Sequence, residues 1–407
     1  MTDILIRVAS SLQYTISLLF HFLTANYLRR IEDPTFEALT MKHIVILGGS
    51  YAGVSTAHRI LKQAAKIGPL KITIVSPNTH FYWSMASPRG VVPGQIPDEK
   101  LFQPIVPGFS KYSASQFEFI TASAASLDFG AKTVSLSSGD TLDYDYIILA
   151  TGSRTREHTP FKGVGTTEET RNALHDFQSE VTNSKTIVIA GAGVTGVEVA
   201  GELAFEYGPA KKIILIAAGS TVLDDAPASI SAYSLKALKN LNVDLKMKAK
   251  VTGTVRLPNG RKELTLSSGD KLTTDMYVPT FGLMPNSSYV PKDYLDKNGS
   301  VKVDEFLRVK GAKDAWAIGD VSNVESWQFI TCDRQSTRLA KNMISMINNK
   351  PPVPYKVAAS KFMGLQIGKK QATGHFGNFK LPTFIVVRAR KTLFTENLGP
   401  TVTGTLF

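Results

Sequence analysis

The sequence has almost no cysteine: Cys332 is the single thiol in 407 residues. One thiol excludes an intramolecular disulfide, a Cys-x-x-Cys redox pair and an all-cysteine metal site, and we assign no metal ligands. If the protein transfers electrons, a bound organic cofactor must therefore carry them.

A concentrated basic region is also missing. The net charge is +12, but lysines and arginines are scattered, and the densest groups are short, at residues 246–250 and 388–391. No nucleic-acid-binding motif accompanies them. We therefore expect no nucleic-acid partner and interpret the charge as a basic surface that favours anionic cofactors or membrane lipids.

Formal charge is absent from residues 8–28, which Arg7 precedes and Arg29 and Arg30 follow. The length matches the ~20 residues that cross a bilayer. Polar residues recur through this segment at three- and four-residue spacing, which suits a helix lying in the interface or against a partner equally well; they are Ser10, Gln13, Ser17, His21 and Thr24. We expect residues 1–31 to form an apolar helix or anchor, with a buried N-terminal helix as the alternative.

No small-x-small cleavage site closes this apolar run, which argues against a secretory signal. We expect the protein to be membrane-associated through residues 8–28. Mitochondria are the expected compartment, and the cytoplasmic face of another membrane is the alternative.

A glycine-rich turn follows an apolar strand at residues 44–47, in "KHIVILGGSYAGVSTAHRILK". Gly48, Ser50 and Gly53 fall on the three glycine positions of G-x-G-x-x-G. In that motif the first residue permits a tight turn, the second lets pyrophosphate approach the backbone, and the third lets the helix pack on the strand. The stretch predicts a dinucleotide site at a helix N-terminus.

A second, complete G-x-G-x-x-G follows the strand at residues 186–190, in "KTIVIAGAGVTGVEVAGELA". Its glycines are Gly191, Gly193 and Gly196. Two such loops, each followed by a helix and a further strand, are far more specific than one. They predict two dinucleotide-binding units, although two unrelated glycine-rich turns remain the alternative.

Both units lack the acidic residue that usually ends the second strand and binds the ribose hydroxyls. Ser76 and Ala217 occupy these places. We expect the Ser76 hydroxyl to bind ribose more weakly than a carboxylate would. Without an acid at Ala217, and with no arginine next to it, the choice between NADH and NADPH stays open.

A nearly repeated stretch follows each unit: "LSSGDTLDYDYIILATG" at residues 136–152 and "LSSGDKLTTDMYVPTFG" at residues 266–282. Ser-Gly-Asp between alternating apolar residues signals a turn, so each copy predicts a hairpin that leads into a strand ending at Gly152 or Gly282. A repeat of this length indicates duplication of a whole domain.

The order GGSYAG, ATG, GAGVTGVE and AWAIGD resembles the two-dinucleotide-binding-domain pyridine nucleotide oxidoreductases. "SPNTHFYWSMASPRG" and the C-terminal "GLQIGKKQATGHFG" resemble, more narrowly, the apoptosis-inducing-factor-like mitochondrion-associated oxidoreductases, which include ferroptosis-suppressing and type II NADH dehydrogenase-like enzymes. The resemblance implies an α/β fold in which an FAD domain is interrupted by an NAD(P)H domain, both Rossmann-like, with a small C-terminal α+β region. We expect the FAD domain at 41–160 and 291–350, the NAD(P)H domain at 161–290 and the C-terminal region at 351–407.

The resemblance also implies roles for individual residues. FAD would lie on one set of residues: Gly48, Ser50, Gly53, Ser76, Arg89, Ala124 near adenine, Thr151, Gly152, Gly319, and Asp320 at the ribityl chain. NADH or NADPH would lie on a second set: Gly191, Gly193, Gly196, Glu198 towards nicotinamide, and Gly282 with Pro285 closing the site. From the residues alone, Asp320 could equally cap a helix, and Glu198 could be an ordinary acid favoured by the helix dipole.

The resemblance implies that NAD(P)H delivers hydride to FAD. The reduced flavin would then pass electrons to a small-molecule acceptor. The lack of a cysteine pair argues against disulfide reduction, and the apolar N-terminus favours a membrane quinone as acceptor. A flavoprotein that modifies a small metabolite and a slowly turning redox sensor are the alternatives.

Residues 351–407 alternate basic and apolar side chains and could form either a surface near lipid or an internal interface. Oligomeric state is not predicted.

Overall fold

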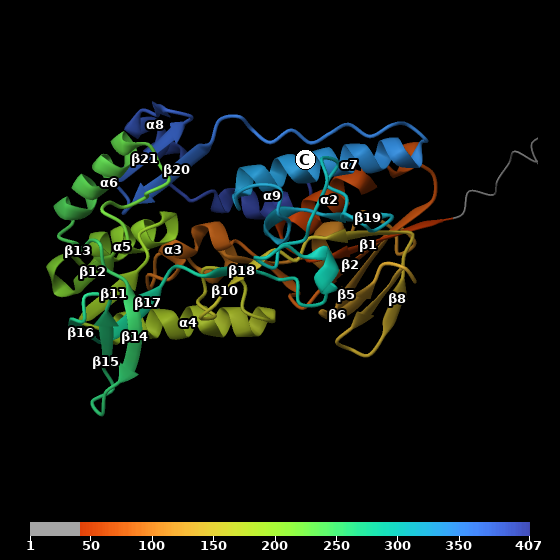
Figure 1. Ribbon diagram of the computed structural model, residues 1–407. Coiled ribbons are helices and arrows are strands. Elements are labelled where there is room, and N and C mark those ends of the chain that lie inside the picture. Colours follow the sequence, from red (N-terminus) through yellow and green to blue (C-terminus); the bar gives the residue numbers. More distant parts are fainter. Residues whose placement is uncertain (1–40) are drawn as a thin grey trace, which may run out of the picture.

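The computed structural model describes residues 41–407. Residues 1–40, which include the predicted apolar helix, lie outside the described residues. Figure 1 shows two α/β units side by side, with the C-terminal segment crossing over both.

The first unit is built on a five-stranded parallel sheet with the strand order β19-β9-β1-β2-β5. Its strands are β1 (Lys42–Leu47), β2 (Leu70–Ser76), β5 (Phe117–Thr121), β9 (Tyr146–Leu149) and β19 (Ala315–Ala317). Central residues such as Ile44 and Ile46 are fully buried, because helices and a small sheet cover both faces, as is usual for parallel sheets. Helices α2 (Tyr51–Leu61) and α7 (Phe329–Ile347) pack against each other on one side.

The second unit has a four-stranded parallel sheet with the order β13-β12-β11-β17. Its strands are β11 (Thr186–Ala190), β12 (Lys212–Ile216), β13 (Asp244–Lys246) and β17 (Met276–Pro279), and its helices are α4 (Thr167–Asn183), α5 (Val194–Tyr207) and α6 (Ala228–Asn240). The two units are joined by an antiparallel pair, β10 (Ser153–Thr155) and β18 (Leu283–Pro285). The chain leaves the first unit through β10 and returns through β18, so β19, which joins the edge of the first sheet, follows the second unit in sequence.

The repeated stretches form equivalent hairpins in small three-stranded sheets. One sheet contains β6 (Ala124–Asp128), β7 (Thr133–Leu136) and β8 (Thr141–Asp143), and the other β14 (Val251–Arg256), β15 (Lys262–Leu266) and β16 (Lys271–Thr274). The turn glycines, Gly139 and Gly269, have φ values of 94° and 90°, which favour glycine. The strands that follow end at Leu149 and Pro279, three residues before the glycines at which we expected them to end.

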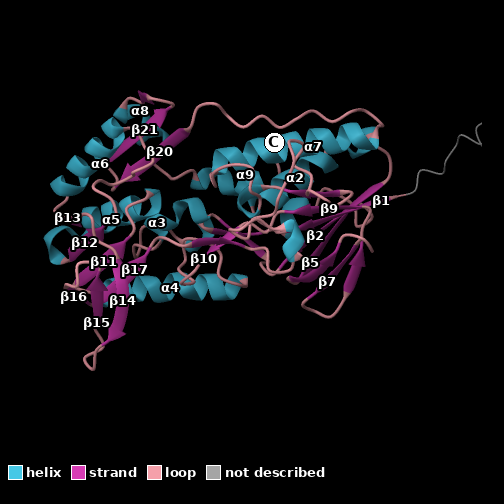
Figure 2. Cartoon of the chain, viewed as in Figure 1, coloured by secondary structure: helices cyan, strands magenta, loops and turns pink. Residues whose placement is uncertain are grey.

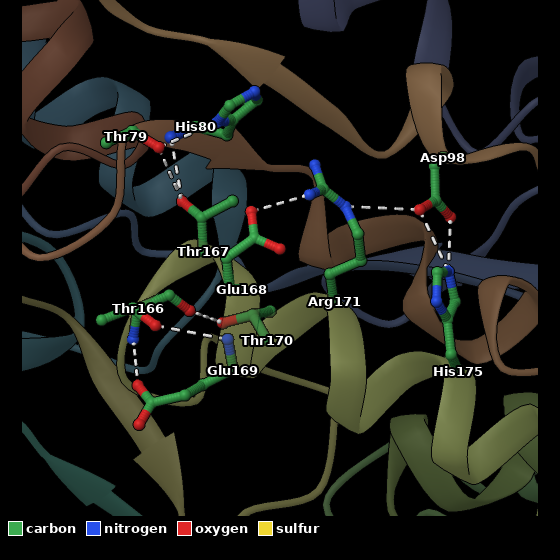
Figure 3. Close-up of polar contacts among 10 residues, drawn as sticks. All are labelled: Thr79, His80, Asp98, Thr166, Thr167, Glu168, Glu169, Thr170, Arg171 and His175. Carbon is green, nitrogen blue, oxygen red and sulfur yellow. Dashed lines mark hydrogen bonds and ion pairs between the residues drawn. The ribbon is translucent and has the colours of Figure 1, made fainter.

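Helix α4 is fixed at its start by a capping box, and Figure 3 shows its contacts. The Thr166 hydroxyl accepts from the Glu169 backbone N–H at 3.2 Å, and the Glu169 carboxylate accepts from the Thr166 N–H at 2.6 Å. Farther along, Arg171 and His175 both contact Asp98 of the first unit. The cap stabilises the helix start, and these partly exposed pairs orient the helix more than they add stability.

The C-terminal region packs on the second unit and then returns to the first (Figure 2). Strands β20 (Phe362–Ile367), β21 (Gln371–Phe376) and β22 (Phe379–Lys380) form an antiparallel sheet that, with α8 (Thr383–Ala389), covers α5 and α6. Helix α9 (Leu398–Val402) then contacts α2. Three short elements complete the first unit: β3 (His80–Tyr82), α3 (Ser87–Gly90) and β4 (Phe102–Pro104). Within residues 41–407, no helix is long and apolar enough to cross a membrane.

Candidate functional site

The first glycine loop joins β1 to α2 and can close only with glycine at two positions. Gly48 has φ 122°, and a β-carbon there would lie 2.2 Å from the carbonyl oxygen of Ala150. A β-carbon at Gly53 would lie 1.9 Å from the carbonyl oxygen of Gly48. Ser50, between them, is exposed and precedes the helix without capping it through its side chain. The loop therefore leaves an open helix N-terminus that suits a phosphate.

The second loop joins β11 to α5 with the same geometry. Gly191 has φ 105°, and a β-carbon at Gly196 would lie 1.8 Å from the Gly191 carbonyl oxygen. A β-carbon at the middle residue, Gly193, would meet no described atom within 4 Å, and the residue is exposed. Tight outer glycines and an open middle residue are what close approach of a pyrophosphate requires.

Gly319 and Asp320 lie where the first loop starts its helix. A β-carbon at Gly319 would lie 3.4 Å from the Ala52 β-carbon on α2, and the Gly319 N–H donates to Gln335 at 2.7 Å. The Asp320 carboxylate accepts from the Ser153 hydroxyl at 2.7 Å and from Lys162 at 2.8 Å. The geometry thus brings Asp320 close to the first glycine loop, where it is hydrogen-bonded to Ser153 and Lys162; its predicted contact with the ribityl chain stays a prediction.

The residues after β9 are hydrogen-bonded to the segment that follows β18. The Thr151 hydroxyl donates to the Asn286 carbonyl at 2.6 Å, and the Asn286 side chain donates to the Thr151 carbonyl at 2.9 Å. Gly152 has φ 67° and Gly282 has φ 75°. Pro285 is buried and pairs with Ser153 in the β10–β18 ladder. These residues meet where the two units join, so Thr151, Gly152, Gly282 and Pro285 are positioned between the two loops.

Glu198 lies on the first turns of α5 and is buried beneath the C-terminal region. Its Oε1 accepts from Arg390 at 2.7 Å and from the Gln366 N–H at 3.2 Å. Burial raises the pKa of the Glu198 carboxyl, and the Arg390 charge opposes that rise. The structure therefore covers this carboxylate with protein, and its predicted role at nicotinamide stays a prediction.

Arg89 contacts α5 in the structure. Its guanidinium makes a two-point ion pair with Glu202, at 3.0 and 2.8 Å, and donates to the Lys391 carbonyl at 2.8 Å. Both side chains are less than a tenth exposed. Arg89 thus joins the first unit, the second unit and the C-terminal region, and the predicted contact with FAD stays a prediction.

The remaining two predicted positions lie at strand ends. Ser76 ends β2, is buried, and accepts a hydrogen bond from the Asn78 N–H at 3.1 Å. A β-carbon at Gly49 would lie 2.9 Å from the Ser76 β-carbon, so a small side chain suits this place against the loop. Ala124 begins β6 and is half-buried opposite Leu136.

Sequence reasoning missed the partners of these residues. They are Lys162 and Ser153 on Asp320, Asn286 on Thr151, Arg390 and Gln366 on Glu198, and Glu202 on Arg89. All of them are more than 100 positions from the residue they contact. The one local signal is the i, i+4 spacing of Glu198 and Glu202, which places two acids on one face of α5.

Two glycine loops at the starts of two equivalent helices, with a shared junction between them, define a protein that binds two dinucleotides. A family model described as pyridine nucleotide-disulphide oxidoreductase matches residues 42–346. The chain belongs to this family.

Relatives extend over most of the chain. It is 55% identical to "Oxidoreductase ptaL" of Pestalotiopsis fici over 371 residues, which are 90% of this chain and 100% of that protein. It is 26% identical to "Ferroptosis suppressor protein 1" of Homo sapiens, over 84% of this chain and 91% of that protein. Among solved structures, the sulfide:quinone oxidoreductase of Aquifex aeolicus matches with a TM-score of 0.71 and 19% identity, over 88% of this chain and 92% of that one.

The family assignment confirms the two-domain α/β fold and the cofactors. The protein is an FAD-dependent NAD(P)H oxidoreductase, with NADH or NADPH as co-substrate. The two loops fit these groups, since each keeps glycine where a β-carbon would collide and exposes the helix N-terminus. Disulfide chemistry does not follow from the family name, because Cys332 is the sole cysteine and burial raises the pKa of its thiol.

Proposed function

We propose that this protein passes electrons from NAD(P)H, through FAD, to a quinone-like acceptor at a membrane, with mitochondria as the expected site. The flavin, when bound, supplies the hydride and electron chemistry. The protein orients the two nucleotides on its paired loops, and Asp320, Thr151 and Asn286 fix the junction between them.

The observation that carries the membrane part is an apolar and basic surface on the C-terminal region, which we call the C-terminal face. Its exposed apolar side chains are Phe376, Phe379, Phe384 and Ile385, and Phe384 is 73% exposed. Phe376 and Phe379 are paired across β21 and β22. Large exposed apolar side chains gathered in one region mark interaction surfaces.

Charge on this region favours an anionic partner. Residues 351–407 contain eight lysines and arginines and one acidic residue, Glu396. A hollow there is lined by Lys370, Arg388 and Lys391 together with Thr383, Phe384 and Val387. Aromatic side chains beside lysines and arginines suit the interface of an anionic bilayer.

The C-terminal face also lies close in sequence to a residue that contacts helix α5. Arg388 lines the hollow, whereas Arg390, two residues later, is bonded to the buried Glu198 on α5. A short segment therefore connects the proposed membrane surface to the helix that starts at the NAD(P)H loop.

The experiment measures two properties of the purified full-length protein: flotation with anionic liposomes, and NADH-dependent reduction of a long-chain quinone within them. We expect Phe379→Ser with Phe384→Ser to lower flotation and long-chain quinone reduction, while reduction of a water-soluble short-chain quinone is kept. Val255→Ser is the matched control, because Val255 is 59% exposed on β14.

Two results would contradict the proposal. If the flavin accepts electrons from NADH but no quinone reoxidises it, the protein acts on another acceptor, such as a small metabolite. If quinone is reduced but the Phe379 and Phe384 substitutions leave flotation unchanged, the C-terminal face is not the membrane contact.

A further inference from the structure

The second unit has Ala217, and no acid, at the end of β12. However, the carboxylate of Asp224, seven residues later, lies close to this strand end. A β-carbon built on Gly219 would lie 2.1 Å from Oδ2 of Asp224. The Asp224 carboxylate therefore rests against the backbone just beyond the strand end. Glycine at 219 is what allows this contact.

The segment that carries Asp224 is fixed directly to the glycine loop. The Leu223 N–H donates to the carbonyl oxygen of Ala192, between Gly191 and Gly193, at 2.9 Å. Leu223 itself is buried with φ 56°, and its carbonyl accepts from the Ser231 hydroxyl on α6 at 3.2 Å. A buried leucine held in this backbone conformation gives the next residue a defined position.

These contacts place an exposed carboxylate between the end of the second strand and the glycine loop. In strand-loop-helix nucleotide sites, the adenosine ribose is bound at that place, and a carboxylate there accepts hydrogen bonds from its hydroxyls. We propose that Asp224 binds the ribose hydroxyls of the nicotinamide nucleotide and makes the protein prefer NADH to NADPH.

The preference follows from charge. The 2′-phosphate of NADPH carries a charge of about −1.5 to −2 near neutral pH, as other phosphate monoesters do, and a carboxylate at its position repels it. Lys248 is a positively charged residue next to the same turn and would favour the 2′-phosphate. It is exposed, and its backbone N–H donates to the Gly219 carbonyl at 2.8 Å. Asp224 contacts the turn through its side chain, whereas the bond from Lys248 is made by its backbone.

The test is calorimetric binding of NAD⁺ and NADP⁺ to the FAD-loaded full-length protein, which needs no electron acceptor and no turnover. We expect wild type to bind NAD⁺ at least about tenfold more tightly than NADP⁺, and Asp224→Ala to reduce that ratio about tenfold, as loss of a charged hydrogen-bond acceptor predicts. Gly219→Ala should have the same effect, because the new methyl group displaces the carboxylate. Asp225→Ala, the neighbouring exposed acid, is the matched control and should leave the ratio unchanged.

The proposal rests on the NAD(P)H oxidoreductase function and not on the quinone. It is overturned if wild type binds NADP⁺ as tightly as NAD⁺ or more tightly, or if Asp224→Ala and Asp225→Ala have the same effect. Selective loss of NADP⁺ binding in Lys248→Ala, from a wild type that favours NADP⁺, would assign the specificity to Lys248 instead. Retained flavin absorbance in every variant separates these outcomes from unfolding.

Discussion

Helices α2 and α5 start at glycine loops of the same geometry, but different partners cover them. Six residues beyond the third glycine of each motif stand Arg59 on α2 and Glu202 on α5. Arg59 pairs with Asp333 at 2.6 Å in a partly exposed position, whereas Glu202 pairs with Arg89 at 2.8 Å and is buried. The two units share the loop geometry but carry side chains of opposite charge at this position.

The difference shows how the two units are held together. Helix α2 packs on α7, which belongs to its own unit, and on α9. Helix α5 packs on α3 of the first unit and on β20 of the C-terminal region, through the buried carboxylates of Glu198 and Glu202. The NAD(P)H unit is therefore fixed to the rest of the molecule by ion pairs at its nucleotide-binding helix.

The largest effects are expected from glycine substitutions in the two loops, and each should remove the binding of a different nucleotide. Gly53→Ala should abolish FAD binding, because the new methyl group would lie 1.9 Å from a backbone oxygen. Gly196→Ala, with a clash at 1.8 Å, should keep the flavin and lose most NADH affinity. The measurements are visible absorbance for flavin and calorimetry for the nucleotide.

Gly163→Ala is the control for these loop variants, because a β-carbon there would lie 4.0 Å from the closest atom, Thr170 Oγ1. Equal loss of flavin in Gly53→Ala and Gly196→Ala would show that the loops do not bind separate nucleotides.

The ion pairs at the equivalent positions should differ in their contribution to stability. Arg89→Ala leaves Glu202 buried without its partner and should lower the free energy of unfolding by about 3–5 kcal/mol. Arg59→Ala removes a more exposed pair and should cost about 1 kcal/mol. Chemical denaturation monitored by fluorescence measures both, and equal losses would contradict the difference between the helices.

The smallest effect at neutral pH is expected from a titratable side chain of the first unit, whose contribution to stability changes only as the pH falls. His58 on α2 is fully buried, stacks on Phe109 and contacts the Val402 carbonyl at 2.8 Å; burial lowers its pKa to about 4. The equivalent residue on α5 is Gly201, which packs against Ile367 of β20. Histidine in the unfolded chain has a pKa of about 6.5. Between about pH 4 and pH 6.5, His58 therefore stays neutral in the native state but is protonated in the unfolded state.

Stability from His58 is therefore complete above about pH 6.5 and is lost as the pH falls towards 4, by about 3 kcal/mol in total. His58→Gln should remove most of this slope. Unfolding free energies of both proteins between neutral pH and pH 4 test the point, and parallel pH profiles would refute it.

The sequence predicts the parts of this fold that depend on local patterns. The glycine spacing predicts both loops, and Ser-Gly-Asp predicts both hairpins, because turns and close packing of helix on strand depend on a few adjacent residues. The contacts at the junction could not be predicted in this way. Asp320 meets Lys162, and Glu198 meets Arg390, only after the chain has crossed between units and returned.

The preference for NADH or NADPH could not be predicted from local patterns either. Ala217 suggested that the second unit has no carboxylate for the ribose, because the motif places the acid at the strand end. Asp224 reaches that place through a buried leucine with positive φ and a glycine without a side chain. Neither residue forms a recognisable motif with the loop.

The most direct test of the central claim is anaerobic addition of one equivalent of NADH to the purified full-length protein, monitored by its visible flavin absorbance. We predict that the protein carries FAD and that its absorbance is bleached in wild type but not in Gly196→Ala with the flavin still bound. A protein without flavin, or a flavin that NADH reduces equally well in both proteins, would contradict hydride transfer between two separately bound nucleotides.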